Sequence, residues 1–574
     1  MLDGTPPDAL YCEGTRPHFS MDAVVRPGGQ MMKLAEVATQ AAAVARRAVD
    51  ETYYATLAVR AGLVTPEWPD RLARMGAAVY RSGLLGGLTG VAAVRYRDRA
   101  ALIDELGTLT FRELDEHTTA LANAWRVRGL RDGETVAILA RNHRGFHYAV
   151  FAAAKCGARI VLLNTDFAGP QLREVVAREG ADLLVFDEEY TEILGDLTAP
   201  RGRYRAWAEE PGVGTLENLI AGAPRTPLRR ATTTAKVILL TSGTTGTPKG
   251  APRRDPTSLA PLGALLDKVP FRAKEITECP APLFHTLGFA HVALALGFGS
   301  TLVLRRRFDP QAVLDSMHRH RATSLIAVPV MLQRLVDLGP RARVGHDFSA
   351  LRIIFVAGSQ LGADLCTRVT DAFGPVIYNL YGSTEVAYAT IATPADLAVE
   401  PGCVGRPVSS ATVKILDDDG NELPPGRTGR IFVGNNFQFE GYTGGGDKAR
   451  VGKLMSSGDV GHFDSAGRLF IDGRDDDMIV SGGENVFPGE VEELLAAHPA
   501  VAEVSAFGVP DERYGQRLRA VLVVREGHTL AEDEVREHVK AHLARFKVPR
   551  DVLFVDELPR NPTGKVLKRV LREL

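Results

Sequence analysis

Short apolar runs alternate with longer helical stretches through the first half of the chain. Residues 136–140, 160–163 and 183–186 are apolar runs that predict buried strands. Between them, residues 146–155 and 171–179 have the spacing of helices. Strands and helices that alternate in this way form βαβ units, so we expect an α/β fold with a mostly parallel sheet covered by helices.

A capping box opens the helix before the first of these strands. Thr110 and Glu113 are three residues apart, the spacing at which each side chain can satisfy the other's free backbone N–H. The helix that follows has Leu114 and Trp125 among its apolar positions and is expected to stop at Gly129.

The second half repeats the strand pattern. Four further short strands are expected at residues 302–304, 324–328, 352–356 and 376–378, with helices between them. Residues 198–234 are rich in proline and polar residues, and we interpret them as a linker.

The first 95 residues are predicted to be an extension of the main body. Residues 1–32 are rich in Pro, Gly and Asp and are expected to be poorly ordered. Residues 34–61 and 70–80 are helical in pattern. A membrane-contacting helix pair is the alternative to simple packing, and packing is preferred because no polybasic face accompanies the helices. The start of translation is left open among three methionines: Met21, Met31 and Met32.

The composition changes near residues 474–477, where a second domain is expected to begin. Strands are expected at 501–509 and 518–524. Apolar faces mark two helices: Val491, Leu494, Leu495 and His498, then Val535, Val539 and Leu543. Roughly 100 residues with these elements can form a separate α+β domain. The predicted division is therefore an extension (1–95), a large domain (96–475) and a small domain (476–574).

The bulk composition is that of an ordinary globular protein and excludes several classes. The chain has 574 residues, 45% of them apolar, and a formal net charge of −2, which gives no case for nucleic acid as a partner. Five scattered cysteines without a CxxC spacing argue against a disulfide framework or zinc site and suit a reducing cytoplasm. No run reaches the ~18 apolar residues of a membrane span, and residues 1–30 lack the pattern of a signal peptide.

A loop rich in glycine and hydroxyl groups follows the apolar strand 237–240. Gly243 and Gly246 can adopt φ > 0 and turn backbone N–H groups toward an anion. No Gly-Lys-Ser/Thr tripeptide closes the loop, so it is not a Walker motif. It is suited to a polyphosphate, with these candidate ligands: Thr241, Ser242, Gly243, Thr244, Thr245 and Lys249.

This loop and five later motifs, in the same order, resemble those of the adenylate-forming superfamily from about residue 95 to the end. Within it, the chain looks most similar to actinobacterial long-chain fatty-acyl-CoA ligases. The later motifs are 357–360 (AGSQ), 381–385 (YGSTE), 456–459 (SSGD), 481–486 (SGGENV) and 559–565 (PRNPTGK).

The resemblance implies a nucleotide site. Tyr381 would stack on adenine, and Gly358, Ser359 and Gly382 would lie close to it. Thr384 would contact the α-phosphate, and Glu385 would offer Mg²⁺ the hard oxygen ligand that it prefers. Asp459 would accept hydrogen bonds from the ribose, and Arg474 would reach the ribose or phosphate.

The resemblance also implies a moving C-terminal domain. Lys565 would contact the carboxylate and α-phosphate during adenylation, and Gly482 and Gly483 would line the pantetheine tunnel. Asp476 maps to the hinge, where φ and ψ change between two states. His285 would border the acyl pocket.

The implied activity is a two-step fatty-acid–CoA ligase that uses ATP, Mg²⁺ and CoA. Small residues at Gly288, Gly358 and Gly382 favour a medium or long acyl chain as the substrate. Delivery of the acyl-adenylate to a carrier protein, as in a fatty-acyl-AMP ligase, is the alternative within the class. Outside it, the rival is a nucleotide-binding regulator or membrane scaffold. A cytoplasmic location is expected, with weak peripheral contact at the inner membrane face and a homodimer left open.

Overall fold

The computed structural model describes residues 45–210, 212–241, 249–252, 258–435, 437–443, 447–475, 479–481, 484–486, 488–511, 515–543, 547–561 and 564–574. The chain divides into two compact units, Met1–Tyr53 and Tyr54–Leu574. Of the first unit, the structure describes residues 45–53, which are helical. The expectation for residues 1–32 lies outside the described residues. All features below belong to the second unit.

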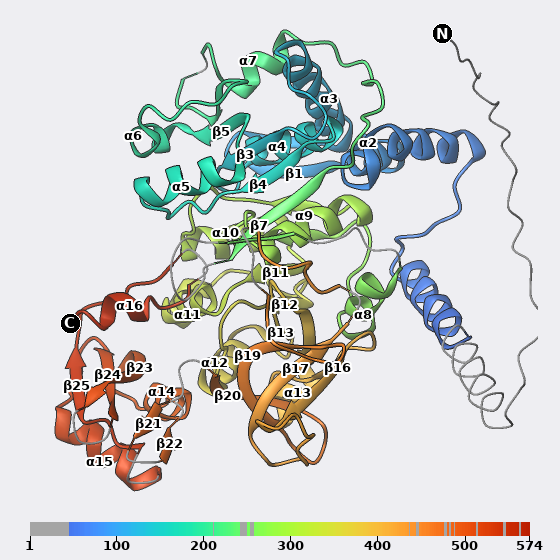
Figure 1. Cartoon of the computed structure of the whole chain (residues 1–574). Coiled ribbons are helices and arrows are strands. Elements are labelled where there is room, and N and C mark those ends of the chain that lie inside the picture. The colour runs from blue at the N-terminus through green and yellow to red at the C-terminus, as the bar shows by residue number, and fades with distance from the viewer. Residues whose placement is uncertain are drawn as a thin grey trace, which may run out of the picture. The chain divides into compact units, whose positions relative to one another are not determined.

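Sheet A has nine strands, of which those from β13 to β1 are parallel and those at the two ends are antiparallel. Figure 1 labels four of its strands, β1, β11, β12 and β13. In spatial order its strands are β15 (Arg406–Pro407), β14 (Ala387–Ala392), β13 (Ile377–Ser383), β12 (Ile353–Val356), β11 (Ser324–Ala327), β9 (Ile276–Glu278), β10 (Thr301–Val303), β1 (Ala100–Asp104) and β2 (Gly107–Thr110).

Sheet B has six strands, all parallel except the last. In order they are β6 (Arg203–Trp207), β5 (Leu183–Asp187), β3 (Thr135–Leu139), β4 (Arg159–Leu162), β7 (Lys236–Thr241) and β8 (Lys249–Pro252). Strands β3 and β5 are buried at every position, as expected for parallel strands covered on both faces. The predicted mostly parallel architecture is confirmed.

Helices cover both sheets. The helix α4 is buried from Gly145 to Lys155, because its alanine-rich sequence lets neighbouring elements approach from all sides. The covering helices are α3 (Phe111–Val127), α4 (Arg144–Lys155), α5 (Gly169–Glu179), α8 (Ala260–Lys268), α9 (Thr286–Phe298), α10 (Pro310–His320), α11 (Pro329–Asp337), α12 (Ala363–Phe373) and α13 (Pro394–Val399).

The predicted capping box at the start of α3 is confirmed. The Thr110 hydroxyl accepts the Glu113 N–H at 3.2 Å, and the Glu113 carboxylate accepts the Thr110 N–H at 2.8 Å. A cap of this kind stabilises a helix by about 1 kcal/mol. Leu114 and Trp125 are fully buried, and the chain leaves the helix through Gly129 at φ +87°.

The helix α2 (Pro69–Tyr96) is a hairpin of two short helices. Gly83 interrupts it with φ 70° and ψ −178°. A Cβ at Gly87 would lie 2.8 Å from the Cα of Val79, so the second arm runs back along the first. Arg71 in the first arm donates to the carbonyl of Val94 at 2.6 Å, at the end of the second arm.

By length and composition alone, α2 passes the test for a membrane span, which the sequence did not lead us to expect. Its reversal at Gly83 leaves two arms of about 14 residues each, and ~20 are needed to cross a bilayer. The second arm instead packs on α3 and α4, where a Cβ at Gly86 would lie 2.9 Å from the backbone of Ala154. The predicted packing extension is thus longer than residues 70–80.

The predicted linker 198–234 contains a strand and a helix. Strand β6 pairs with β5, and α7 (Leu216–Ala221) follows it with Thr215 as its N-cap. The strand was missed because it lies at the edge of sheet B and alternates arginine with less polar residues. Arg203 lies over the ring of Phe186 at 5.1 Å, so its side chain covers the sheet that it borders.

Two further sheets complete the fold. Sheet C is antiparallel, with strands β16 (Thr412–Leu416), β17 (Gly429–Gly434), β18 (Arg450–Val451), β19 (Leu454–Phe463) and β20 (Leu469–Arg474). Sheet D lies C-terminal to residue 478 and confirms the predicted strand and helix pattern there. Its elements are β21 (Ile479–Ser481), β22 (Glu484–Val486), α14 (Pro488–Ala496), β23 (Val501–Asp511), β24 (Gly515–Val524), α15 (Glu532–His542) and β25 (Asp551–Phe554), followed by α16 (Lys568–Leu571).

Gly87→Ala tests the α2 hairpin. The added methyl group collides with the backbone of Val79, so we expect a loss of about 1–3 kcal/mol in the free energy of unfolding. Gly76→Ala in the first arm is the control, because nothing lies within 4 Å of its Cβ position. There the better helix propensity of alanine gives up to about 1 kcal/mol of stabilisation. Denaturant unfolding measures both, and equal stabilisation by the two variants would contradict a hairpin.

Candidate functional site

The carboxyl ends of β11 and β12 meet the C-terminal segment of the chain. Gly358 follows β12 at φ +105°, and a Cβ there would lie 3.4 Å from a methyl group of Val328. Gly564 has φ +77°, and a Cβ there would lie 2.3 Å from a methyl group of Val330. The turn that presents Lys565 therefore lies at the same sheet edge as Gly358. Ligands of parallel sheets bind at such edges.

Two hydrogen bonds between Asn561 and Lys565 hold the turn that presents Lys565. The amide of Asn561 donates to the Lys565 carbonyl at 2.9 Å, and the Lys565 amide donates to the Asn561 side chain at 2.8 Å. The side chain of Lys565 is exposed.

Asp459 is held between two strands and a tyrosine. It faces Arg474 across the β19–β20 pair, with its Oδ1 3.0 Å from the guanidinium. The hydroxyl of Tyr381 donates to the other carboxylate oxygen at 2.6 Å. Burial, together with the nearby carboxylate, raises the pKa of Tyr381 well above its usual value, so this hydroxyl remains a donor. Three of the predicted nucleotide ligands thus lie together.

The predicted YGSTE motif forms the turn between β13 and β14. The register shifts at Gly382, where a Cβ would lie 1.9 Å from the carbonyl oxygen of Ala387. The backbone amide of Glu385 then donates to the hydroxyl oxygen of Ser383 at 3.2 Å. Its Oε1 accepts the hydroxyl of Tyr442 at 2.8 Å. The tight turn places Glu385 beside a segment of the chain that the sequence analysis did not single out.

That segment, residues 437–443, also contacts the exit of the glycine-rich loop. Strand β8 begins at Lys249, which pairs with Thr241 at the end of β7. Gly250 in β8 donates to the Thr443 hydroxyl at 2.9 Å and accepts the Thr443 amide at 2.8 Å. The loop and Glu385 are therefore bridged through Tyr442 and Thr443, which no local motif marks: only their contacts across the fold reveal them.

Several predicted site residues lie outside the described residues or have undescribed side chains. The side chains of Thr241 and Lys249 are not described, although the strands that contain these residues are. The others lie outside the described residues altogether: Ser242, Gly243, Thr244, Thr245, Asp476, Gly482 and Gly483. Their roles stay predictions.

His285 stands at the start of α9 with a buried ring. The ring contacts Phe284 with centroids 4.5 Å apart, and its Nε2 is a buried atom without a hydrogen-bond partner among the described residues. Burial lowers the pKa of His285 to about 4, so the imidazole is neutral at physiological pH. A buried neutral imidazole with a free nitrogen can accept or donate one hydrogen bond to a ligand.

The argument from small residues to a long acyl chain is wrong for two of its three glycines. A Cβ at Gly288 would lie 2.3 Å from the Pro282 carbonyl oxygen, and at Gly382 backbone lies nearer still. The space beside both residues is filled by main chain, so their missing side chains leave no room for a substrate. Only at Gly358 is the nearest atom a side chain at ordinary contact distance.

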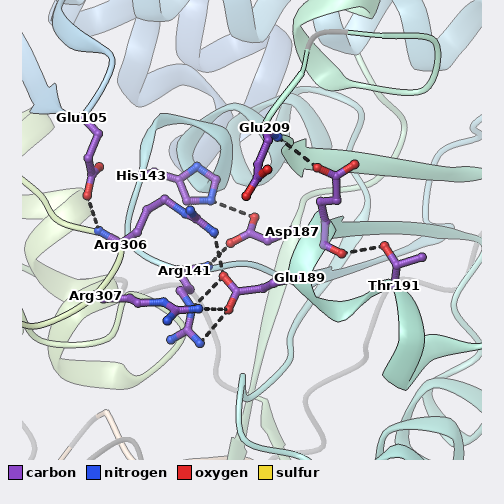
Figure 2. A network of polar contacts seen from close by, with 10 residues as sticks. Glu105, Arg141, His143, Asp187, Glu189, Thr191, Glu209, Arg306 and Arg307 are labelled. Carbon is purple, nitrogen blue, oxygen red and sulfur yellow. Dashed lines mark hydrogen bonds and ion pairs between the residues drawn. The ribbon is translucent and has the colours of Figure 1, made fainter.

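A polar network joins the carboxyl ends of strands from both sheets, as Figure 2 shows. Glu189, just after β5, accepts from Arg141 at 2.9 Å, Arg306 at 2.6 Å and Arg307 at 3.0 Å. Beside it, the fully buried His143 lies 2.8 Å from Asp187. The Nδ1 of His143 accepts the Gly145 N–H, so its Nε2 carries the proton that Asp187 accepts. This network fixes sheet A against sheet B.

One carboxylate of the site suits a magnesium ion. The described residues contain no group of three or more His, Cys, Asp or Glu that could hold a metal by themselves. Glu385 keeps its Oε2 clear of the Tyr442 hydrogen bond. Mg²⁺ usually binds through one or two carboxylates together with substrate phosphates, so this donor set fits an ion that arrives with a nucleotide.

Comparison with known proteins decides the family. A family model described as AMP-binding enzyme matches residues 91–443, more than half of the chain, and a second, described as AMP-binding enzyme C-terminal domain, matches residues 490–565. The chain belongs to the AMP-binding enzyme family. As an AMP-binding enzyme, it is an AMP-forming acid–thiol ligase that uses ATP, Mg²⁺ and CoA.

Individual relatives of this AMP-binding enzyme differ in their acids. It is 34% identical over 535 residues to an indoleacetate–CoA ligase of Aromatoleum aromaticum, covering 88% of this chain and 97% of the relative. It is 30% identical over 486 residues to ScoC of Streptomyces coeruleorubidus, a fatty acid–[acyl-carrier-protein] ligase, covering 82% and 93%. The anthranilate CoA ligase AuaEII, solved with anthranoyl-AMP, matches with a TM-score of 0.76 and 26% identity, covering 85% and 96%. A specific affiliation with actinobacterial long-chain fatty-acyl-CoA ligases is not supported.

Tyr381→Phe tests whether the hydrogen bond from Tyr381 to Asp459 contributes to nucleotide binding. The loss of one hydrogen bond to a partly buried carboxylate should leave Asp459 less well oriented and raise the KM for ATP by about fivefold. Tyr378→Phe on the same strand is the matched control and should leave that KM unchanged. Initial rates with varied ATP measure both, and the same KM in the two variants would remove Tyr381 from nucleotide binding.

Proposed function

We propose that this enzyme converts a compact aromatic or arylalkanoic acid to its CoA thioester through an acyl-adenylate. The acid attacks the α-phosphate of ATP and releases pyrophosphate, and the thiol of CoA then displaces AMP. The observation that supports this site best is the position of the Lys565 turn, which lies at the carboxyl edge occupied by Gly358.

In the first step the protein has to position two anions and neutralise charge. Lys565, in the turn at this edge, contacts the carboxylate and the α-phosphate. Thr384 lies in the YGSTE turn and contacts the same phosphate. Glu385 would hold Mg²⁺, and the ion would supply positive charge beside the phosphates. Asp459, fixed by Tyr381 and Arg474, orients the ribose.

In the second step a thiol needs the space beside the acyl carbonyl that Lys565 occupied. A rotation about Asp476 exchanges the two groups and brings in Gly482 and Gly483. The backbone just before the hinge is fixed: the Asp475 amide donates to the Gly458 carbonyl at 3.0 Å, and its carboxylate pairs with Arg430 at 3.0 Å. These contacts support a hinge that begins after Asp475.

Lys565→Ala separates the two steps. We expect acyl-adenylate formation, measured as ATP–pyrophosphate exchange, to fall by about 100-fold or more, because one charge contact in the transition state is lost. Thioester formation from a supplied acyl-adenylate should stay within about threefold of the unchanged enzyme. Lys568→Ala is the control, since Lys568 in the next turn pairs with Glu492 and should affect neither step. Equal loss of both steps in Lys565→Ala would contradict the exchange.

Three observations support an aromatic rather than a long aliphatic acid. The names of the Aromatoleum relative and of AuaEII are those of ligases for indoleacetate and anthranilate. In this chain, Gly288 and Gly382 are packed against main chain and open no channel. His285, which we propose borders the acyl pocket, has a buried neutral ring whose Nε2 has no hydrogen-bond partner among the described residues.

A panel of acids with ATP and CoA tests the substrate class. Indoleacetate, ferulate, anthranilate, octanoate and palmitate should be compared by kcat/KM. We expect at least one aromatic acid to exceed palmitate by about 100-fold, the difference that a pocket of the wrong shape produces. A preference for palmitate would overturn the aromatic assignment.

The second candidate is a fatty-acyl ligase that delivers its product to a carrier protein. It is favoured by the similarity to ScoC over 93% of that protein. Palmitate activation, followed by transfer to a holo-acyl-carrier protein in preference to CoA, would establish this candidate instead.

A further inference from the structure

Thr443 makes three hydrogen bonds that tie the exit of the glycine-rich loop to a buried anchor. Its amide donates to the Gly250 carbonyl at 2.8 Å, and its hydroxyl oxygen accepts the Gly250 N–H at 2.9 Å. The same hydroxyl lies 2.9 Å from Oε1 of Glu179, at the end of α5. A carboxylate can only accept, so the hydroxyl proton points to Glu179 and its lone pair points to Gly250.

Glu179 is a fixed acceptor. It is 3% exposed, and its carboxylate pairs with Arg178 at 3.0 Å and Arg159 at 3.4 Å. A buried carboxylate with such partners has one low-energy position. The position of the Thr443 hydroxyl, and of β8 through it, follows from that of Glu179.

Strand β8 has no room for a side chain at Gly250. A Cβ there would lie 2.6 Å from the Thr443 hydroxyl and 2.6 Å from a methyl group of Ile238 in β7. The glycine lets the two segments approach this closely, and any other residue would push β8 away from Thr443.

Tyr442, which precedes Thr443 in the sequence, holds the Glu385 carboxylate in place. Its hydroxyl donates to Oε1 at 2.8 Å, and its ring packs edge-on against Phe439 with centroids 4.8 Å apart. Phe439 in turn donates its amide to the Glu385 carbonyl at 2.9 Å.

We propose that Tyr442 and Thr443 are positioning residues that hold the exit of the glycine-rich loop and the Glu385 carboxylate at a fixed separation, so that MgATP meets a preformed site. Because the two residues are adjacent, a single peptide bond joins the residue that contacts the loop exit to the residue that contacts Glu385. This inference rests on the proposed function, since it assumes that the loop binds the phosphates and that Glu385 binds the ion. The two residues act through their neighbours and touch neither substrate.

The test compares how tightly three variants bind ATP together with Mn²⁺, which replaces Mg²⁺. Binding is measured as the decrease in the electron paramagnetic resonance signal of free Mn²⁺. Thr443→Val keeps the shape and loses the hydroxyl, so the Kd of Mn²⁺–ATP should rise about tenfold. Thr443→Ser keeps the hydroxyl and should stay within about threefold of the unchanged enzyme. Tyr442→Phe should raise the Mn²⁺ concentration for half-saturation at fixed ATP by about fivefold.

Two further readouts distinguish positioning from general stability. In Thr443→Val the KM for the carboxylate should stay within about twofold while the KM for ATP rises with the Kd. Thr277→Val removes a buried hydrogen bond to Ser324 elsewhere in sheet A, and it should lower the unfolding temperature without changing Mn²⁺–ATP binding.

Unchanged Mn²⁺–ATP binding in Thr443→Val and Tyr442→Phe would overturn the inference, as would an equal loss in Thr277→Val. If Thr443→Val is insoluble, the result for Tyr442→Phe alone decides the test, because that substitution removes only one oxygen atom. Absence of ATP–pyrophosphate exchange in the unchanged enzyme with every acid would instead overturn the proposed function, so the two failures are separate.

Discussion

The Asp459 carboxylate is the point at which the parts of the site are fixed together. It accepts from Tyr381 in β13 of sheet A and from Arg474 in the neighbouring strand of sheet C, and the carbonyl of the preceding residue, Gly458, accepts the Asp475 amide. Arg474 compensates the charge of this largely buried carboxylate, and Tyr381 satisfies its second oxygen, so the loss of either partner would weaken its fixed position. This one constraint sets the nucleotide ligands of two sheets and the last residue before the proposed hinge in a common frame.

A second set of contacts extends that frame to the phosphates. Glu385 lies on the same turn as Tyr381, and Tyr442 and Thr443 connect it to β8 and to the buried Glu179. In a separate network, Glu189 accepts from three arginines that follow strands of the two sheets. Hydrogen bonds therefore hold both Glu385 and β8, the strand that follows the glycine-rich sequence, in fixed positions.

Much of the fold could be predicted from the sequence because local patterns determine it. The parallel strands of both sheets and the capping box at Thr110 follow from hydrophobic periodicity and cap chemistry. The edge strand β6 could not, because an edge position tolerates arginines that look like loop residues. The reversal at Gly83 also escaped, since one glycine inside an apolar helical pattern does not say whether the helix continues or turns back.

Site residues could be predicted where a short sequence motif contains the groups that bind the ligand. They could not be predicted where a residue acts through a partner that is distant in sequence. Asp459 and Arg474 were found as separate motifs, and the fold pairs them. Tyr442 and Thr443 have no local signature, and their roles appear only through Glu385 and Gly250. The meaning of Gly288 and Gly382 was misjudged for the same reason: the sequence records a missing side chain but not the backbone that fills its place.

The central claim is that the acid is activated by attack on the α-phosphate of ATP. Incubation of the enzyme with ATP, Mg²⁺, CoA and an accepted acid labelled with ¹⁸O in its carboxylate tests it most directly. The account predicts AMP and pyrophosphate in equal amounts with the thioester, and one labelled oxygen transferred to the phosphate of AMP. ADP and inorganic phosphate as products, with the label in the phosphate, would contradict it.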